Sequence, residues 1–205
     1  MPSNTVLHIG PMKSGKSKEL LDIAIQLKKR KRKYVCFKPA LDSRNGDYIY
    51  SRHYKNDYVL PVTKVEYAKQ IYNLVVKNNS GYTDVLIDEI MLFDSDIIGV
   101  IDSFYYHGID LYAAGLDMDF RKYPFQLKDW GVRNHLDEII SINMQHVIEQ
   151  FEEVIYHYSL CDVCGEKAKY TQRLIDGEPA SLDSPLILIG DEEYQARCGK
   201  HHVIF

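Results

Sequence analysis

One eight-residue segment near the N-terminus carries the residue types needed to bind phosphate groups. It reads Gly10-Pro11-Met12-Lys13-Ser14-Gly15-Lys16-Ser17 and matches the pattern G-x-x-x-x-G-K-[ST] at every fixed position. The glycines let backbone N–H groups point at phosphate oxygens, Lys16 reaches the β- and γ-phosphates, and Ser17 ligates Mg²⁺. The alternative is a glycine turn with an incidental lysine. A predicted strand before the segment and a predicted helix after it favour a loop that binds a nucleoside triphosphate.

An acidic pair, Asp88-Glu89, lies at the end of the strand predicted at 84–88. In a phosphate-loop protein, an acid at the tip of such a strand faces the loop and holds Mg²⁺ directly or through water. Glu89, one residue further on, could act as a general base toward a substrate hydroxyl. An isolated acidic pair is more often a solvated turn, but the phosphate loop and a parallel sheet favour the functional interpretation.

Three cysteines and a histidine near the C-terminus have the spacing of metal ligands. Cys161 and Cys164 form one C-x-x-C pair, and Cys198 and His201 form a C-x-x-H pair. Tetrahedral Zn²⁺ takes four such ligands, and a site with four protein ligands has no open position, so we predict a structural zinc that staples segment 165–197. His202 could replace His201, although the matching spacing favours His201. Redox chemistry at the C-x-x-C pair is the rival interpretation.

The pattern of apolar residues predicts strands and helices in alternation over the first half of the chain. Strands are predicted at 6–9, 34–38, 84–88 and 111–114, and helices at 16–31, 65–76 and 97–106. The segment 41–62 is polar and rich in Tyr, without a period, and is predicted to be a loop. This order implies an α/β fold in which helices cover both faces of a mostly parallel sheet.

The last quarter of the chain has a different character. Residues 137–153 mix helix and strand signals, 155–160 predict a strand, and the sequence after Cys161 is rich in Cys, Gly and charge. We therefore predict two units, a nucleotide-binding α/β domain at 1–158 and a zinc-stapled segment at 159–205.

The composition excludes some classes of partner. The 205 residues are 45% hydrophobic and 26% charged with a net charge of −4, as in soluble globular proteins and unlike a generic nucleic-acid binder. The basic run Lys28–Lys33 follows a predicted helix and is interpreted as a solvated surface. No segment approaches the ~20 apolar residues of a membrane span, and no signal peptide is recognised. We expect a reducing, cytoplasmic location without disulfides.

These motifs together resemble the type II thymidine kinases, the tetrameric cytosolic type. Five segments occur in the family's order, GPMKSGKSKEL (10–20), DEIMLF (88–93), AGLDMDFRKYPF (114–125), TQRL (171–174) and YQARCGKH (194–201). Each segment alone is only suggestive, whereas five in order over nearly the whole chain are highly specific. The resemblance implies a homotetramer that uses Mg²⁺ to transfer the γ-phosphate of ATP to the 5′-hydroxyl of thymidine or deoxyuridine in nucleotide salvage.

The resemblance also implies roles for individual residues. Glu89 would be the base that takes the 5′-hydroxyl proton. Asp42 and Arg44 look like the family's acid–arginine pair near the phosphates, which places a second acid near the metal and a cation near the transferring phosphoryl group. Lys16 would be the third catalytic residue, and Asp88 would join Ser17 and Asp42 around Mg²⁺.

The nucleoside site is implied by the same resemblance. The positions that match those around the thymine ring and its 5-methyl group are Met12, Leu116, Thr171 and Tyr194, and the matching aromatic positions are Phe120 and Phe125. The zinc-stapled segment would be a lasso that folds over the nucleoside, reads the base largely through its backbone and excludes water.

The sequence departs from the family's pattern at several positions. Lys13 stands where Phe is usual, Ile90-Met91 replaces a small or aliphatic residue followed by Gln, and Leu92 stands where an aromatic residue is common. The segment 126–152 is longer than the family norm. The loss of a polar side chain near the nucleoside bears on base preference, and the long segment bears on the oligomer interface.

Two other functions are compatible with the motifs. One is a kinase for another deoxynucleoside, and the other is a nucleotide-binding regulator whose zinc appendage docks a protein or nucleic acid. A docking appendage would carry exposed basic and aromatic residues, but segment 165–197 has no basic excess. This composition favours a thymidine kinase.

Overall fold

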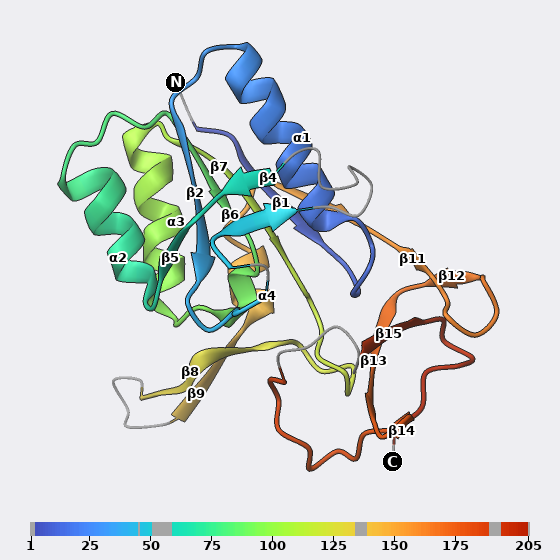
Figure 1. Ribbon diagram of the computed structural model, residues 1–205. Helices are drawn as coiled ribbons and strands as arrows, with labels where there is room; N and C mark the ends of the chain where they lie inside the picture. Colours follow the sequence, from blue (N-terminus) through green and yellow to red (C-terminus); the bar gives the residue numbers. More distant parts are fainter. Residues whose placement is uncertain (1–2, 45, 51–58, 134–138, 189–193, 205) are drawn as a thin grey trace.

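A parallel sheet forms the centre of the molecule (Figure 1). The computed structural model describes residues 3–44, 46–50, 59–133, 139–188 and 194–204, and in these residues six strands pair in the order β10-β1-β7-β6-β2-β5. They are β1 (Thr5–Ile9), β2 (Tyr34–Pro39), β5 (Thr63–Val65), β6 (Asp84–Ile87), β7 (Asp110–Gly115) and β10 (Glu153–Tyr156). All neighbouring pairs are parallel, which confirms the predicted α/β fold.

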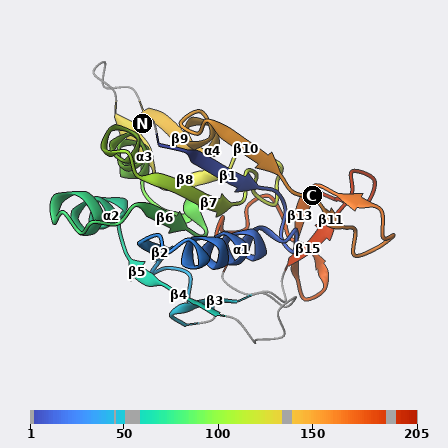
Figure 2. The same ribbon diagram turned by 90° about the horizontal axis from the view of Figure 1, so that it is seen from above.

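Helices cover both faces of this sheet (Figure 2). One face carries α1 (Lys16–Lys29), and the other carries α2 (Ala68–Tyr72), its π-helical continuation η2 (Asn73–Lys77), α3 (Asp96–His107) and α4 (Met144–Ile148). In β6, Val85 and Ile87 pack in the apolar cluster that contains α2 and α3, whereas Leu86 packs in the cluster that contains α1. An uninterrupted apolar run is therefore required, because both sides of the strand are buried.

The buried stripes of the two long helices follow the predicted spacing. They are formed by Leu20, Leu21, Ala24 and Leu27 in α1 and by Ile97, Val100, Ile101 and Phe104 in α3. A glycine flanks each helix at one end: Gly15 precedes α1 with φ +89°, and Gly108 follows α3 with φ +64°. Glycine adopts this left-handed backbone conformation without the steric cost that other residues incur.

Two antiparallel hairpins extend from this core. The first joins β3 (Tyr48–Tyr50) to β4 (Val59–Pro61), and its Ile49 and Leu60 pack on α1. The prediction of a loop over 41–62 was therefore wrong at 48–50 and 59–61, because strands of three residues are too short to show a period; residues 45 and 51–58 of that segment lie outside the described residues. The second hairpin joins β8 (Gln126–Arg133) to β9 (Ile139–Asn143), within the segment 126–152.

Residues 159–204, which we call the C-terminal module, form small sheets beside the phosphate loop (Figure 1). These sheets consist of β11 (Ser159–Leu160), β12 (Lys167–Ala168), β13 (Tyr170–Ile175), β14 (Glu178–Pro179) and β15 (Tyr194–Arg197). The single strand predicted at 155–160 was wrong. Its first part ends β10 of the central sheet, and its last two residues form β11, which pairs with β12. The sequence 155–160 gives no sign of this change of sheet, because it is a run of mostly apolar and aromatic residues without a turn signal.

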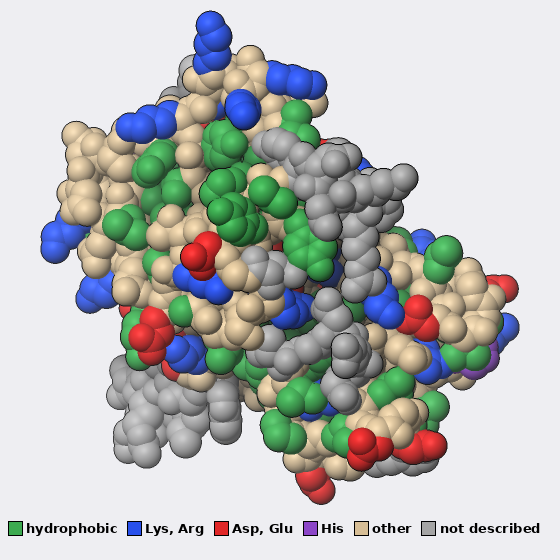
Figure 3. Space-filling model, viewed as in Figure 1, with side chains coloured by type: hydrophobic (Ala, Val, Ile, Leu, Met, Phe, Trp, Pro, Cys, Tyr) green, Lys and Arg blue, Asp and Glu red, His purple; other side chains and the backbone are tan. Residues whose placement is uncertain are grey.

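The basic run Lys28–Lys33 is exposed, as predicted, and blue side chains gather around the end of α1 (Figure 3). Arg32 nevertheless has a structural role, because it pairs with Asp84 and Asp110 at the starts of β6 and β7. Within the described ranges, none of the helices has both the length and the apolar character to cross a bilayer.

Candidate functional site

The predicted phosphate and metal residues lie along one edge of the central sheet. The phosphate loop follows β1, Asp42 and Arg44 follow β2, and Asp88 and Glu89 follow β6. In a parallel sheet the carboxyl ends of the strands lie at the same edge, where α/β proteins bind their ligands. Residues far apart in the sequence are therefore brought together by topology alone.

The two fixed glycines of the phosphate loop are needed for backbone reasons. Gly15 has the left-handed conformation described above, and Gly10 has φ +144°. A Cβ on Gly10 would lie 2.3 Å from the carbonyl oxygen of His157, at the end of β10. The first glycine thus permits close contact with the neighbouring strand as well as the turn itself.

Lys16 lies inside the phosphate loop. Its Nζ donates to the carbonyl oxygens of Gly10 at 3.0 Å and Pro11 at 2.7 Å. Burial lowers the pKa of Lys16, and the nearby carboxylates of Glu89 and Asp88 oppose this shift. These contacts pre-position the ammonium group at the edge where phosphates would bind.

The oxygens that would hold Mg²⁺ face each other. The Ser17 hydroxyl lies 3.4 Å from both carboxylate oxygens of Asp88. Burial, followed by the negative charge of Glu89, raises the pKa of Asp88 to about 7. A buried carboxylate of this kind favours its ionised form once a cation binds beside it. The donor set therefore fits a hard divalent ion such as Mg²⁺.

Arg44 links two acids at the same edge. Its Nε donates to Asp42 Oδ1 at 2.8 Å, and its Nη2 donates to Glu89 Oε1 at 2.5 Å. Lys38, a fully buried residue of β2, contacts Asp42 Oδ2 at 2.9 Å. Although burial opposes it, hydrogen bonding to Arg44 lowers the pKa of Asp42, with Lys38 adding to this effect. Both Asp42 oxygens are thus engaged by cations.

Glu89 has an unusual backbone for a residue with a side chain. Its φ of +51° and ψ of +45° lie in the left-handed region, and its N–H donates to Asp88 Oδ1 at 3.1 Å. A non-glycine residue there carries local strain, which is found most often at functional sites. The conformation turns the chain sharply after β6, and Glu89 lines both of the pockets described next.

Two pockets meet at this edge. The first is lined by the phosphate loop together with Lys38, Asp42, Tyr48–Tyr50 and Asp88. The second is more apolar and lies between the central domain and the C-terminal module. Their shared lining residues are Met12, Arg44, Glu89 and Leu116. A carboxylate and a guanidinium group therefore lie where one pocket passes into the other.

The second pocket contains every residue predicted for the nucleoside site. These are Met12, Leu116, Phe120, Phe125, Thr171 and Tyr194. Sequence reasoning did not assign the other lining residues, which are Met91, Leu92, Asp119 and Leu186–Leu188. Three of them, Met91, Leu92 and Asp119, belong to the segments DEIMLF and AGLDMDFRKYPF, so their neighbours could have identified them, but Leu186–Leu188 lie in no motif.

The departure at Met91 has a structural consequence. Met91 is buried, and its sulfur accepts a hydrogen bond from the Leu116 N–H at 3.4 Å. The thioether thus occupies space beside a residue that lines both pockets, in place of a polar amide.

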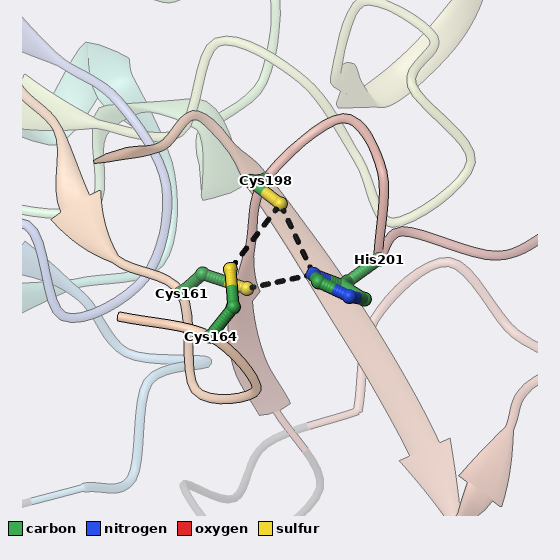
Figure 4. Close-up of side chains that lie close together, drawn as sticks. All are labelled: Cys161, Cys164, Cys198 and His201. Atoms are coloured by element: carbon green, nitrogen blue, oxygen red, sulfur yellow. Dashed lines mark hydrogen bonds between the residues drawn. The ribbon is translucent and has the colours of Figure 1, made fainter. Parts of the chain in front are cut away.

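The four predicted zinc ligands converge on one point (Figure 4). The Sγ atoms of Cys164 and Cys198 are 3.8 Å apart, and His201 Nδ1 lies 3.8 Å from Cys161 Sγ and 3.3 Å from Cys198 Sγ. A tetrahedron with Zn–S bonds of about 2.3 Å has edges of about 3.8 Å. The ligand set therefore fits structural zinc. Although burial of the Cys161 thiol opposes it, backbone hydrogen bonds lower the pKa of Cys161 to about 6.

His202 does not take part in this cluster. Its Nε2 lies 2.9 Å from the Phe120 carbonyl oxygen and 3.2 Å from that of Thr171. This side chain ties the C-terminal module to the turn before Phe125 instead. The ring of His201, and not that of His202, lies in the group of side chains that could hold a metal ion.

The C-terminal module also touches the phosphate loop. The Met12 N–H donates to Thr171 Oγ1 at 3.1 Å, and the Ser159 hydroxyl donates to the Lys13 carbonyl oxygen at 3.1 Å. Lys13 Nζ lies 3.2 Å from Asp162, a residue between the two zinc-binding cysteines. Lys13 has φ +61°, so these contacts hold a strained residue. The zinc-stapled segment therefore supports the loop as well as the second pocket.

A histidine pair lies beneath the phosphate loop and was missed by the sequence analysis. His8 in β1 is buried, and its Nδ1 lies 2.9 Å from His157 Nε2. Burial, and then the neighbouring His157, lowers the pKa of His8 to about 4. Both rings are therefore neutral near pH 7.

Known proteins match this chain in sequence over nearly its whole length. A model of the thymidine kinase family matches residues 4–202. The chain is 33% identical over 201 residues to a thymidine kinase from Thermococcus kodakarensis, an alignment that covers 95% of this chain and 91% of that protein. Among solved structures, a Pif1 helicase from Candida albicans matches 76% of this chain and 35% of its own, at 15% identity and a TM-score of 0.38. That TM-score is too low to carry an argument.

Proposed function

The chain belongs to the thymidine kinase family, and we propose that it transfers the γ-phosphate of ATP to the 5′-hydroxyl of thymidine and, less well, of deoxyuridine. Membership of this family makes it a phosphotransferase that acts on a nucleoside and a nucleotide. One observation supports the proposal most strongly: Glu89 and Arg44 line both pockets. A group that passes from a nucleotide in the first pocket to a nucleoside in the second must cross this point.

We propose that the phosphate side works mainly by positioning and charge. The loop N–H groups and Lys16 would hold the triphosphate, while Ser17 and Asp88 would hold Mg²⁺, which neutralises phosphate charge when bound. Asp42 also lines the first pocket, but both of its oxygens contact cations. In this proposal Asp42 is a second acid near the metal, and it orients Arg44 next to the transferring phosphoryl group.

Glu89 is the proposed general base. It would accept the proton of the 5′-hydroxyl as that oxygen attacks the γ-phosphorus, and ADP would leave with the bridging oxygen. The 2.5 Å contact with Arg44 Nη2 fixes the direction of its carboxylate. A base held in this way is useful only if the nucleoside hydroxyl is held equally well, which is the task of the second pocket.

The second pocket would select the base by size and by its hydrogen-bonding edge. Apolar and aromatic side chains, including Phe120 and Phe125, would enclose a pyrimidine ring, and the zinc staple would prevent the lid from retreating to admit a purine. Deoxyuridine lacks only a methyl group, a difference of about 1–3 kcal/mol. Deoxycytidine presents a donor where thymidine presents an acceptor, and such a buried mismatch is costly.

The test is a substrate panel. Purified protein is incubated with labelled ATP, Mg²⁺ and each deoxynucleoside in turn, and the 5′-monophosphates are separated and counted. The expected order is thymidine, deoxyuridine and then deoxycytidine far behind, with purine nucleosides unreactive. Efficient phosphorylation of deoxycytidine or deoxyadenosine would overturn the choice of thymidine but not the transfer reaction itself.

The resemblance to type II enzymes supports three further parts of the proposal. These are a homotetramer, a cytoplasmic location and a role in nucleotide salvage. We also propose the division of the chain into a kinase domain at 1–158 and a lid at 159–205, because the chain leaves the central sheet after β10 and enters the small sheets at β11. Size-exclusion chromatography with light scattering would test the oligomer.

A further inference from the structure

Arg173, in the interior of β13, belongs to the segment TQRL, but the family resemblance gives this buried cation no role, and it lines neither pocket. It is the largest of the fully buried side chains, with a relative exposure of 1%. Within the described part of the chain, no carboxylate lies within ion-pair distance of its guanidinium group. A buried guanidinium group needs partners that accept its hydrogen bonds, so the uncharged groups that it contacts must be well placed.

Those partners all belong to the segment that closes the second pocket. The guanidinium group donates to the carbonyl oxygens of Pro185 and Leu186, the latter at 2.9 Å, and to the Tyr194 hydroxyl at 2.9 Å. The Tyr194 hydroxyl in turn donates to the Leu188 carbonyl oxygen at 2.8 Å. Arg173 thus contacts Pro185 and Leu186 directly, and it is linked to Leu188 through the Tyr194 hydroxyl.

Two aromatic rings pack against the Arg173 guanidinium group on the side of the second pocket. The Arg173 Cζ atom lies 4.4 Å from the centroid of Phe120 and 5.5 Å from that of Tyr194. Both aromatic residues line the second pocket, whereas Arg173 does not. It therefore lies behind the wall of the pocket and contacts the residues that form it.

We propose that Arg173 is a positioning residue that fixes the lid segment Pro185–Leu188 and Tyr194 against the second pocket. It acts through these residues and does not touch the nucleoside, and the inference rests on the proposed assignment of that pocket to the nucleoside. Arginine is required because its planar fork donates in several directions at once and also stacks on Phe120. Lysine has a single compact ammonium group, which cannot donate in several directions and stack on an aromatic ring at the same time.

The test compares Arg173→Lys with Arg197→Lys. Arg197 lies on the neighbouring strand β15 and bonds to Gln195 of the same sheet, so its replacement makes the same chemical change without touching the lid. Dissociation constants for thymidine and for a non-hydrolysable ATP analogue are measured separately by calorimetry. Arg173→Lys should weaken thymidine binding by about 10- to 100-fold, because hydrogen bonds to a charged group are lost, and should leave analogue binding within about threefold. The control should change neither by more than about threefold.

A second measurement does not depend on any substrate. Chymotrypsin cleaves after leucine and tyrosine in mobile segments, so its attack at Leu186, Leu188 and Tyr194 reports how firmly the lid is held. Cleavage there in the ligand-free protein should be at least tenfold faster in Arg173→Lys than in Arg197→Lys. This result would stand even if the substrate panel showed a different nucleoside, which would then replace thymidine in the binding experiment.

Two outcomes would overturn the inference. One is unchanged thymidine affinity and unchanged cleavage in Arg173→Lys. The other is an equal loss of thymidine and ATP-analogue binding with a lowered melting temperature, which would make Arg173 a general stabiliser of the fold. If Arg173→Lys does not fold, the wild-type lid is compared with Tyr194→Phe, which removes only the hydroxyl that links Arg173 to Leu188. Cleavage at Leu186 and Leu188 that is no faster in that variant would also refute the linkage.

Discussion

Two arginines lie at opposite ends of the same parallel sheet, and each bridges two carboxylates. Arg32 joins Asp84 and Asp110, at 2.7 and 2.6 Å, at the amino ends of β6 and β7. Arg44 joins Asp42 and Glu89 at the carboxyl edge. The contacts are alike in chemistry, yet we assign stability to the first pair and catalysis to the second.

The difference lies in the backbone that carries the acids. Asp84 and Asp110 are residues of regular strands, and Asp84 is fully buried. Asp42 and Glu89 lie in the loops that follow strands, and Glu89 has a strained, left-handed backbone. Residues in loops can present their charges to a ligand, whereas residues inside strands can only be neutralised by the protein. The position of an ion pair along a parallel sheet therefore says more about its role than its geometry does.

The largest effect should come from removing the proposed zinc ion, which would hold the C-terminal module in place at the carboxyl edge of the sheet. Purified protein should contain one zinc ion per chain, and Cys161→Ser should release it, because structural zinc contributes much of the folding free energy of such a segment. KM for nucleoside should rise most, and KM for ATP should rise as well, since Thr171 and Asp162 contact the phosphate loop.

Metal analysis by mass spectrometry and steady-state kinetics provide the measurements for this variant. Cys36→Ala, in β2, is the control and should keep its zinc. Absence of zinc from wild-type protein purified without chelators would refute the metal assignment.

The next largest effect should be that of Glu89→Gln. The amide keeps the shape of the side chain but accepts no proton, so kcat should fall by about 10²–10⁴-fold while the free energy of unfolding stays close to that of the wild type. Initial rates and urea unfolding are measured together, with Glu149→Gln, an exposed glutamate after α4, as the control. A loss of less than about tenfold would leave Glu89 as a positioning residue for Arg44.

Arg32→Ala should show the opposite behaviour. The change leaves Asp84 buried without its cation, and we expect the free energy of unfolding to fall by about 2–3 kcal/mol, less than for a fully buried pair because Arg32 is partly exposed. The kcat of the folded variant should remain near the wild-type value. Arg30→Ala, in the same exposed run, should cost no more than about 0.5 kcal/mol. A kcat loss comparable to that of Glu89→Gln would break the distinction between the two ends of the sheet.

The free energy of unfolding should also depend on pH, because His8 of β1 is held in its neutral form in the folded protein. Because the pKa of His8 is lowered to about 4 in the folded protein, the unfolded chain takes up a proton below its ordinary pKa of 6.5 that the folded chain does not. The contribution of His8 to the free energy of unfolding should therefore be largest above about pH 6.5 and fall by about 1–3 kcal/mol as the pH drops toward 4, whereas Asp88, whose pKa is raised, contributes in the opposite direction.

Urea unfolding of the wild type and of His8→Gln at pH 7.5 and pH 5 would measure this contribution. From pH 7.5 to pH 5 the free energy of unfolding of the wild type should fall relative to that of His8→Gln, while His107→Gln, at the exposed end of α3, should follow the wild type. An equal pH dependence in wild type and His8→Gln would assign it to other groups.

The smallest effect should be that of Asp162→Asn. It removes the partly exposed ion pair with Lys13, and such pairs contribute about 0.2–1 kcal/mol, so ATP affinity should fall by about 1.5- to 5-fold. Glu66→Gln, which removes the pair with Lys128 before α2, should leave ATP affinity unchanged. An identical ATP affinity in both variants would show that the Lys13 contact does not support the loop.

The phosphate loop, the acidic pair and the zinc ligands could be predicted from the sequence because each is a local pattern with a fixed spacing. The strands around them could be predicted because a parallel sheet needs continuous apolar runs. The β3–β4 hairpin could not, since its strands are too short to show a period. Lys38 and Arg173 could not either, because a charged residue within a strand gives no sign of which partners the fold will supply.

Strand β1 has a consequence for how the molecule is made. The strand lies between β7 and β10, and β10 is formed by residues 153–156, close to the other end of the chain. During synthesis β1 therefore remains an edge strand, with unpaired backbone groups, until most of the polypeptide has left the ribosome. The loop that follows it gains one of its neighbours, His157 against Gly10, at the same late moment. A pairing of such high contact order closes slowly, so a nascent or truncated chain that ends before β10 should be unable to bind nucleotide.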